Sequence, residues 1–278
     1  MVAMRRAPPV SCPADYRKMI VAQITDMHVR RKGKLLHHMF NPGKRLRRAV
    51  ARINRLNPRP DVVLATGDLT ESGKRKEYKR LRELLEPLDI PLFVIPGNHD
   101  RREAMRAAFA DKPYLPAYGP LQYAIEQYPV RLIGLDTMQD GMPGGILDDD
   151  RLAWIETMLA RAPAKPTLIF MHHPPFRTGI RAIDALGFKG SEAFGDIVER
   201  NPQIERIVCG HIHRAMEVRW HGTTVCTALS TSHQFALELR EKQPLGFTRE
   251  PPGFALHVWG DADIVTHHCL VDTKGLRA

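Results

Sequence analysis

Five short apolar segments recur along the chain, and each is followed at once by residues that can bind metals or transfer protons. The segments are residues 18–25, 61–66, 91–95, 166–171 and 204–208. Their length and their branched or aromatic side chains are typical of strands buried on both faces. Leu46, Val50 and Ile53 follow helical spacing between the first two segments. Alternating strands and helices predict an α/β fold with largely parallel sheets.

The rest of the chain is predicted to add helices and antiparallel strand pairs. Helices are expected over residues 44–57, 101–109 and 191–199, and around two leucine-rich stripes that contain Leu81 and Leu152. Antiparallel pairs are expected for residues 121–127 with 130–136, 215–220 with 223–228, and 254–259 with 264–271. Residues 29–43 are expected to form a loop that Asn41-Pro42-Gly43 closes as a helix breaker.

Polar residues follow the carboxyl end of each of the five predicted strands. In chain order they are Asp26 and His28, Asp68, Asn98 and His99, His172, and His211 and His213. Alternate side chains of an extended backbone project to the same side, so Asp26 and His28 can face one point. Ligands of open α/β sheets bind outside the carboxyl ends of the strands. We therefore expect these residues to share one site.

The chemistry of this set points to divalent metals. Carboxylates, an amide and neutral imidazoles suit manganese, iron, cobalt or zinc. Seven candidate ligands exceed the needs of one tetrahedral ion and suffice for two ions if one carboxylate bridges them. Two ions about 3.5–4 Å apart can clamp the attacking and leaving oxygens of a phosphoryl transfer. A lone Asp-x-His or His-x-His is more often structural, but five such clusters in order favour one assembled site.

Taken together, these motifs resemble those of the calcineurin-like metallophosphoesterases. The matching residues are Asp26-x-His28, Gly67-Asp68, Gly97-Asn98-His99-Asp100, His172-His173-Pro174 and Gly210-His211-x-His213. The resemblance covers residues 18–271 and is greatest to the bacterial class III cyclic-nucleotide phosphodiesterases and the related glycerophosphodiesterases. The similarity to these two subgroups is carried by three segments, namely Gly67-Asp68-Leu69-Thr70, His172-His173-Pro174-Pro175 and residues 229–233. The fold that it implies is a four-layer α/β/β/α sandwich with two mixed sheets.

The resemblance also implies a role for each site residue. The first of two divalent metal ions would be held by Asp26, His28, Asp68 and His213. The second would be held by Asp68, Asn98, His172 and His211, so that Asp68 bridges the two ions. His99 would face the phosphate instead of a metal, where it could stabilise charge or protonate the leaving alkoxide. The nucleophile would be a metal-bound hydroxide. The implied activity is hydrolysis of a small phosphodiester, either a cyclic nucleotide or a glycerophosphodiester.

Other functions stay open as alternatives. The same metals could support a promiscuous phosphomonoesterase. The net charge of +10 slightly favours a nucleic-acid-directed metallophosphoesterase or a non-catalytic metal-binding scaffold. However, the basic stretches at residues 30–34, 44–48 and 74–76 contain no aromatic side chains for base stacking. We interpret them as solvated surface, part of which could attract an anionic substrate. A scaffold also has no need of His99.

Several neighbouring residues are assigned supporting roles. His173 is expected to form a hydrogen bond behind the metal ligands, and Asp100 to orient His99 or its loop. His233 could either line the substrate pocket or lie on a surface loop. Cys209 is expected in the core. The remaining histidines are expected to be structural or exposed, namely His37, His38, His221, His257, His267 and His268.

The chain is predicted to form one domain over residues 18–278. Residues 1–17 lack the apolar core of a secretory signal and are expected to form a flexible tail. Residues 176–203 and 240–252 could cap the site or mediate assembly into a dimer or larger homo-oligomer. No window approaches the roughly 18 apolar residues of a membrane span, so no membrane partner is expected. The four cysteines are scattered without a Cys-x-x-Cys pair, which fits the reducing cytoplasm.

Overall fold

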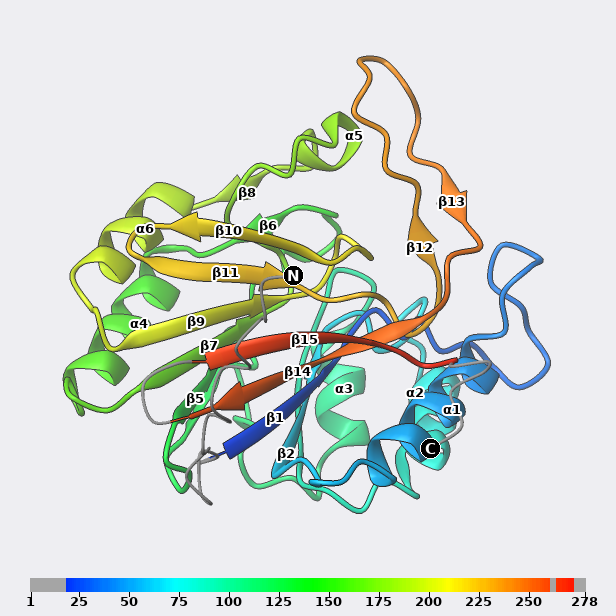
Figure 1. Ribbon diagram of the computed structural model, residues 1–278, viewed down its shortest axis with the longest axis horizontal. Helices are drawn as coiled ribbons and strands as arrows, with labels where there is room; N and C mark the ends of the chain where they lie inside the picture. Colours follow the sequence, from blue (N-terminus) through cyan, green and yellow to red (C-terminus); the bar gives the residue numbers. More distant parts are fainter. Residues whose placement is uncertain (1–18, 261–263, 273–278) are drawn as a thin grey trace, which may run out of the picture.

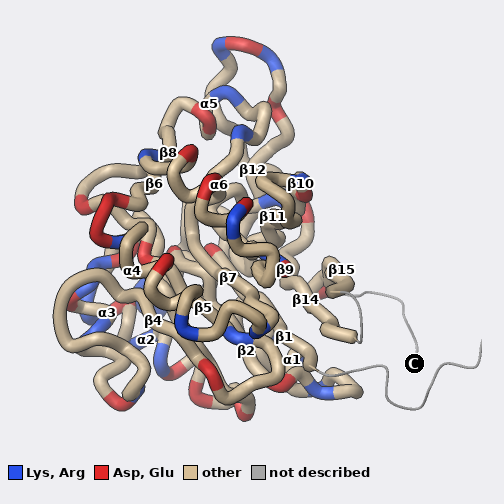
Figure 2. The backbone as a smooth tube through the Cα atoms, turned by 90° about the vertical axis from the view of Figure 1, so that its left-hand side faces the viewer, with Lys and Arg blue, Asp and Glu red and all other residues tan. Residues whose placement is uncertain are grey.

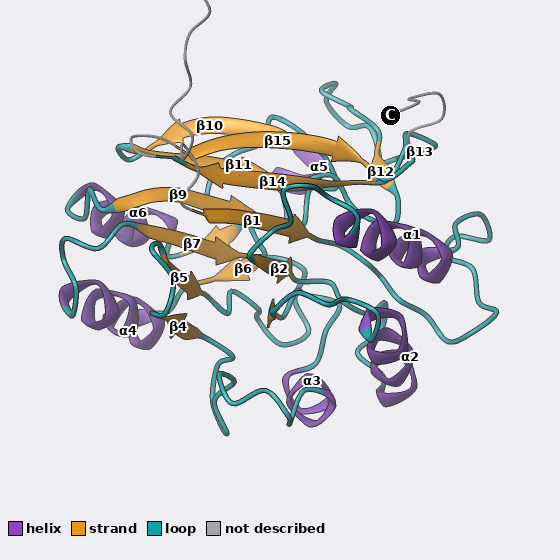
Figure 3. Cartoon of the chain, turned by 60° about the horizontal axis from the view of Figure 1, so that its bottom comes forward, coloured by secondary structure: helices purple, strands orange, loops and turns teal. Residues whose placement is uncertain are grey.

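Two β-sheets lie face to face with helices on both outer sides (Figure 1, Figure 3). This computed structural model describes residues 19–260 and 264–272, and the tail expected at residues 1–17 lies outside the described residues. The first sheet has five strands and the second has six, and both mix parallel with antiparallel pairs. The four-layer sandwich expected from the motifs is therefore confirmed.

The first sheet has the strand order β15-β14-β1-β2-β3. Its parallel strands are β1 (Met19–Ile24), β2 (Val62–Thr66) and β3 (Leu92–Ile95). The antiparallel strands β14 (Gly253–Trp259) and β15 (Ile264–Leu270) complete it on the other edge. The outer face is covered by the helices α1 (Pro42–Asn54), α2 (Arg75–Leu85) and α3 (Arg102–Ala108) (Figure 3).

The second sheet has the strand order β10-β11-β9-β7-β5-β4. The central parallel strands are β5 (Arg131–Gly134), β7 (Thr167–Met171), β9 (Ile204–Cys209) and β11 (Thr223–Thr227). The edge strands β4 (Tyr123–Ile125) and β10 (Met216–Trp220) pair antiparallel, as the sequence predicts. The helices α4 (Asp149–Ala160) and α6 (Ser191–Glu199) lie on its outer face (Figure 1).

Some short elements differ from the sequence prediction. The elements β6 (Gly145–Ile146), α5 (Arg181–Asp184), β8 (Phe188–Lys189), β12 (Gln234–Phe235) and β13 (Phe247–Thr248) were not predicted. Elements of two to four residues are too short to show a hydrophobic period. The start of α1 was also misplaced, because Asn41 is its cap and accepts a hydrogen bond from the Lys44 amide (2.9 Å). Pro42 is then the first helical residue, where its missing N–H costs nothing.

Three apolar layers hold the sandwich together. The central layer packs the inner faces of the two sheets against each other, for example Val21 and Leu64 with Leu168 and Val208. A second layer lies between the first sheet and helices α1 to α3, and a third between the second sheet and helices α4 and α6. Among the described residues, no helix is long and apolar enough to cross a membrane.

A chain of buried polar side chains crosses between the sheets. The Gln23 amide donates to the Thr66 hydroxyl and to the carbonyl oxygen of Cys209 in the second sheet (both 2.9 Å). The Gln23 side-chain oxygen lies 3.1 Å from His257 Nε2, and His257 Nδ1 lies 2.9 Å from the Thr266 hydroxyl. This network is satisfied when His257 is neutral, with its proton on Nε2.

We predict that His257 makes the protein less stable in mild acid. Burial, aided by Arg206 and His268, lowers the pKa of His257 to about 3, whereas an unfolded histidine has a pKa of about 6.5. Between these values the unfolded state binds a proton that the folded state does not. The free energy of unfolding should therefore fall as the pH drops below about 6.5, by up to about 1.4 kcal/mol per pH unit.

Urea unfolding at pH 7.5 and 5.5 tests this difference. The variant His257→Gln should lose less stability between the two pH values than the unaltered protein, by about 1 kcal/mol. The variant His221→Gln, at a side chain that is 30% exposed, serves as a matched control. Equal pH dependence in all three proteins would show that His257 does not have this effect.

A buried ion pair anchors α3 to the second sheet. The Asp136 side chain is fully buried and accepts from Arg102 Nε (2.6 Å) and Nη2 (3.0 Å). It also accepts from the backbone amides of Leu121 (2.7 Å) and Met138 (3.0 Å). Arg102 reaches a second carboxylate, Asp140, whose side chain is 81% exposed.

Removing the buried partner should cost far more than removing the exposed one. Asp136→Ala leaves two buried amides without their acceptor. It also takes the buried carboxylate from a part-buried guanidinium, which keeps Asp140 and the Met138 carbonyl. We therefore expect a loss of about 2–4 kcal/mol. Asp140→Ala should cost less than about 1 kcal/mol because water screens that pair. Chemical denaturation of both variants measures the difference, and similar losses for the two would contradict this assignment.

Candidate metal centre

The seven predicted ligands lie together where the carboxyl ends of strands from both sheets meet. Backbone hydrogen bonds join the loop after β1 to the loop after β2, from Asp26 N to Gly67 O (3.1 Å) and from His28 N to Asp68 O (2.9 Å). The loops after β7 and β9 are joined in the same way. The backbone amide of His211 then donates across the two sheets to both Asp26 carboxylate oxygens (3.1 Å each). The site is therefore built where the two sheets touch.

One group of four side chains has its donor atoms all within 4.8 Å of one another. It comprises Asp26, His28, Asp68 and His213, all of them buried. His213 Nε2 lies 3.3 Å from an Asp26 oxygen, and His28 Nε2 lies 3.4 Å from Asp68 Oδ2. The Nε2 atoms of the two histidines are 3.1 Å apart. These convergent nitrogens and carboxylate oxygens are a donor set that a transition metal accepts.

A second group lies on the other side of Asp68. His172 Nε2 is 3.5 Å from Asp68 Oδ1 and 3.2 Å from Asn98 Oδ1. Donor nitrogens of His172, His173 and His211 lie within 4.8 Å of one another. The two oxygens of Asp68 thus face opposite groups. A carboxylate in this arrangement has the geometry of a bridging ligand.

The ring orientation of two candidate histidines is set by a hydrogen bond on the nitrogen that faces away from the site. Nδ1 of His172 lies 2.8 Å from the carbonyl of Thr66, and Nδ1 of His213 lies 2.8 Å from the carbonyl of His233. Because a carbonyl only accepts, both Nδ1 atoms must carry the proton. Their Nε2 atoms therefore point into the site, where an ion that displaces any proton on Nε2 can bind.

The electrostatics of the site also favour a cation. Burial raises the pKa of the Asp68 carboxyl, but the imidazoles of His172 and His99 outweigh burial and hold that pKa well below its usual range. The Asp26 pKa is lowered too, since the nearby His213 outweighs the effect of burial. Burial lowers the pKa of His172, yet Asp68 and then Asp26 raise it to about 9. Two ionised carboxylates in a buried site attract positive charge.

Left-handed backbone recurs at the candidate ligands. Five of the seven have positive φ angles, namely Asp26 (50°), His28 (44°), Asp68 (48°), His211 (70°) and His213 (51°). Such a conformation costs a non-glycine residue about 1–3 kcal/mol and persists only where the surroundings enforce it. The turns after β1, β2 and β9 are therefore held in shape by the packing of the two sheets.

Glycines allow the closest approach in the site. A Cβ on Gly97 would lie 2.2 Å from Asp68 Oδ1, and a Cβ on Gly67 would lie 2.4 Å from His172 Nδ1. Gly67 also has a φ angle of +90°. The Gly-Asp and Gly-Asn-His motifs thus have a steric reason, because any larger residue would displace the candidate ligands.

His99 and Asp100 have separate environments, although they adjoin Asn98 in the sequence. The His99 side chain is 40% exposed and lines the cavity above the metal groups, with Nδ1 2.8 Å from the Glu71 carbonyl. The Asp100 carboxylate instead accepts from the amides of Leu69 and Gly97 and from the Tyr78 hydroxyl. Of the two roles considered for Asp100, holding the loop fits these contacts, whereas orienting His99 does not.

The cavity has a volume of about 340 Å³ and a polar and an apolar side. The apolar side comes from Ile183 and Leu186 near α5, and from Phe235, Leu245 and Phe247 near β12 and β13. Four of these five side chains lie in the segments 176–203 and 240–252, which were expected to cover the site. These segments therefore form the wall opposite the candidate ligands.

The contacts and exposure of three further histidines can be compared with their predicted roles. His173 Nδ1 pairs with the Thr137 hydroxyl (2.9 Å), which is not a candidate ligand. His233 is 2% exposed and lines the cavity, which decides between its two alternatives. His37 is exposed as expected, but its ring stacks on Phe247 (3.9 Å between centroids) and also lines the cavity.

Glu71 is a site residue that the sequence did not reveal. Its carboxylate lies 2.9 Å from His28 Nδ1 and 3.8 Å from His99 Nδ1. A carboxylate behind a metal-binding histidine fixes the ring and makes it a better ligand. The one available signal was its position three residues after Asp68 in the same loop, and a single acidic residue in a turn is too common to be diagnostic.

The sequence and the fold of this chain are both similar to those of known proteins. The family model described as calcineurin-like phosphoesterase matches residues 19–215. The chain belongs to this family. Among curated relatives, it is 39% identical over 251 residues to a probable glycerophosphodiester phosphodiesterase GpdQ of Arcobacter nitrofigilis, covering 90% of this chain and 92% of that protein. It is 30% identical to the 3′,5′-cyclic adenosine monophosphate phosphodiesterase CpdA of Escherichia coli strain K12, covering 77% and 76% respectively.

Two solved structures also resemble this one in fold. A dimetal phosphatase from Danio rerio superimposes with a TM-score of 0.60 at 14% identity, covering 90% of this chain and 98% of that one. GAP50 from Plasmodium superimposes with a TM-score of 0.64 at 13% identity, covering 92% and 85%. At such low identities the likeness establishes the fold alone.

We predict that Glu71 strengthens metal binding through His28. Glu71→Gln should weaken the affinity of the protein for Mn²⁺ about 10–100-fold, because the His28 ring loses the carboxylate that orients it. Competition with a chelating dye measures this affinity. Glu83→Gln, at an exposed glutamate on α2, is the matched control, and equal affinities in both variants would contradict the assignment.

Proposed function

We propose that this protein is a dinuclear metal-dependent phosphodiesterase that hydrolyses small phosphodiesters, either cyclic nucleotides or glycerophosphodiesters. The observation that carries the proposal is the placement of Asp68, whose two oxygens lie 3.4 and 3.5 Å from His28 Nε2 and His172 Nε2 on opposite sides. The names of the relatives, GpdQ and CpdA, support both substrate classes.

In this proposal the ligand sets are those implied by the family motifs. Asp26, His28, Asp68 and His213 hold one ion, and Asp68, Asn98, His172 and His211 hold the other. Manganese, iron, zinc and cobalt all suit these donors. When bound, the ions lower the pKa of coordinated water to about 7 and so supply a nucleophile at neutral pH. The buried, ionised Asp26 and Asp68 provide the negative charge that holds the ions.

His99 is the proposed catalytic residue. Its Nδ1 atom donates to the Glu71 carbonyl, which leaves Nε2 for the substrate. Its ring packs edge-on against His28 (4.7 Å between centroids) and lines the cavity beside the candidate ligands. A histidine in this position can stabilise the charge on the phosphate or deliver a proton to the leaving oxygen.

The alternatives have less support. Figure 2 shows acidic and basic residues interspersed along the part of the chain that faces the viewer. Basic residues of the 30–34 loop and α2 do gather around two shallow hollows, but no aromatic side chain lines either hollow. The second candidate is a phosphomonoesterase that uses the same metals. Comparing turnover of phosphodiesters and phosphomonoesters distinguishes it from the proposed phosphodiesterase.

The proposal also covers the location, domain organisation and self-association of the enzyme. We place it in the cytoplasm, as a single domain in which residues 176–203 and 240–252 cap the site. Leu237 and Leu239, just before the second of these segments, are 60% and 59% exposed. We include self-association through these two leucines in the proposal, because apolar surface that is covered by a partner is removed from water.

Activity should depend on the second metal group. With bis(p-nitrophenyl) phosphate and added Mn²⁺ we expect turnover that a chelator abolishes and that Asn98→Ala lowers at least about 100-fold, since this change removes a ligand. A panel of 3′,5′- and 2′,3′-cyclic nucleotides, glycerophosphodiesters and monoesters then ranks the substrates. Turnover that neither chelation nor Asn98→Ala affects would rule out the dinuclear mechanism.

Loss of His99 should affect catalysis without affecting metal content. His99→Ala should lower kcat about 10²–10⁴-fold, the usual contribution of a general acid. Bound metal, measured by elemental analysis after desalting, should match that of the unaltered protein because His99 is not a ligand in this proposal. A variant that loses metal and activity together would instead make His99 a ligand.

A further inference from the structure

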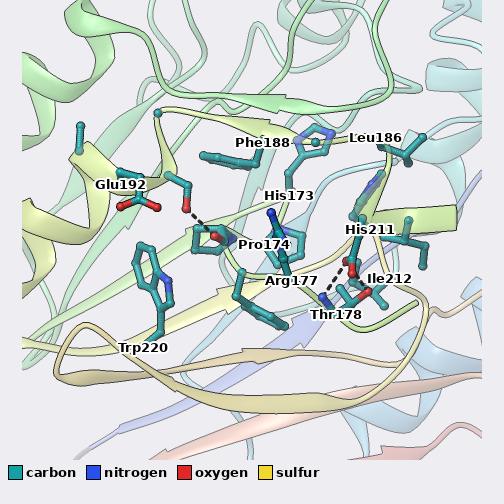
Figure 4. Close-up of a pocket in the computed structure, with 18 residues that line it drawn as sticks. His173, Pro174, Arg177, Thr178, Leu186, Phe188, Glu192, His211, Ile212 and Trp220 are labelled. Carbon is teal, nitrogen blue, oxygen red and sulfur yellow. Dashed lines mark hydrogen bonds between the residues drawn. The ribbon is translucent and has the colours of Figure 1, made fainter. Parts of the chain in front are cut away.

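A second hollow of about 740 Å³ adjoins the proposed metal site (Figure 4). It lies beneath residues 174–193 and extends toward β10. Three residues line both this hollow and the smaller cavity, namely Ile183, Leu186 and His211. His211 is a proposed ligand of the second metal. The larger hollow therefore shares a wall with the cavity where a phosphate would bind.

The wall of the hollow nearest the metals includes a buried histidine. His173 lines this end and is 2% exposed. Its Nδ1 atom pairs with Thr137. Burial lowers the pKa of His173 well below its usual range, although the backbone of Pro143 lies close enough to the ring to raise that pKa.

The walls of the hollow are aromatic. Phe176, Phe188 and Trp220 line it, and Figure 4 places Trp220 at the opposite end from His211. The Trp220 ring contacts Phe194 (5.6 Å between centroids) and His221 (4.6 Å), so that packing holds it in place. Rigid aromatic faces of this kind favour flat, unsaturated rings over flexible polyols.

Two charged side chains beside these aromatic walls are free to bind. Arg177 and Glu192 line the hollow, are exposed, and form no ion pair with any described residue. By contrast, the neighbouring polar groups are engaged within the wall. Thr178 donates to Asp184, and Ser191 donates to the carbonyl of Pro175. A guanidinium donor and a carboxylate acceptor together match the mixed acceptor and donor edge of a nucleobase.

We propose that this hollow binds a nucleoside arm of the phosphodiester, and this proposal rests on the phosphodiesterase function proposed above. The phosphate would lie at the metals, the sugar beside His173, and the base between the aromatic walls, with its edge toward Arg177 and Glu192. A volume of about 740 Å³ falls within the usual range for organic ligands, and it greatly exceeds what a glycerol arm requires. The preferred substrates would thus be nucleoside phosphodiesters.

Two chromogenic diesters with the same leaving group test whether the hollow binds the nucleoside arm. Because the leaving group is the same, a difference in kcat/KM between them reports on the other substituent of the phosphate. Methyl p-nitrophenyl phosphate carries a minimal arm, and thymidine 5′-(p-nitrophenyl phosphate) carries a nucleoside. Thymine offers carbonyl oxygens to Arg177 and an N–H to Glu192. The unaltered protein should show a higher kcat/KM for the thymidine diester.

Variants of the hollow should affect only the thymidine substrate. Arg177→Ala removes the donor, and Ala193→Phe fills the hollow from an exposed position on α6. Each should lower kcat/KM for the thymidine diester about tenfold, equal to about 1.4 kcal/mol, and leave the methyl diester within about twofold. The matched controls are Arg200→Ala and Ala153→Phe, which are exposed positions away from the hollow.

The outcomes distinguish this inference from the general function. Equal losses on both diesters, or no loss on either, would overturn the nucleoside site while leaving the phosphodiesterase intact. Absence of turnover on both diesters would instead count against the proposed function. Calorimetric binding of thymidine 5′-monophosphate needs no turnover. Unchanged affinity in Ala193→Phe would overturn the nucleoside site on its own.

Discussion

The site depends on one carboxylate held between two sheets. Asp68 has a left-handed backbone, its carbonyl accepts from the His28 amide, and its Oδ1 accepts from the His99 amide (2.9 Å). Its two oxygens face His28 and His172, which belong to different sheets. Any shift of one sheet relative to the other would change both distances, so the geometry of the site follows directly from the packing of the sandwich.

The surrounding structure is arranged to keep that carboxylate in place. Gly67 and Gly97 let neighbouring loops approach it more closely than a Cβ would allow. Asp100 joins the loops after β2 and β3 by accepting hydrogen bonds from Leu69 and Gly97. The Gln23 network and the central apolar layer hold the two sheets in register beneath the site. Apolar burial thus provides the stability, and polar contacts determine the positions.

The strands and the candidate ligands were predictable for a local reason. Each buried strand is a continuous apolar run, and its candidate ligands follow within four residues. One local pattern therefore predicts both the end of the strand and the ligand position. The residues that were missed or left open act across long separations in the chain. Glu71 is 43 residues from His28, and His233 is 20 residues from His213, whose ring its carbonyl orients. No local pattern records such pairs.

The sequence by itself determined the α/β class, the order of the strands along the chain and the residue types that gather at their ends. Hydrophobic period and motif spacing are local properties, because they depend only on residues that are close together in the sequence. Only the tertiary structure decided which oxygen of Asp68 faces which histidine, which Nε2 atoms point inward, and that the hollow under residues 174–193 lies beside the metal site. Those features depend on distances between segments far apart in the sequence, and packing alone sets them.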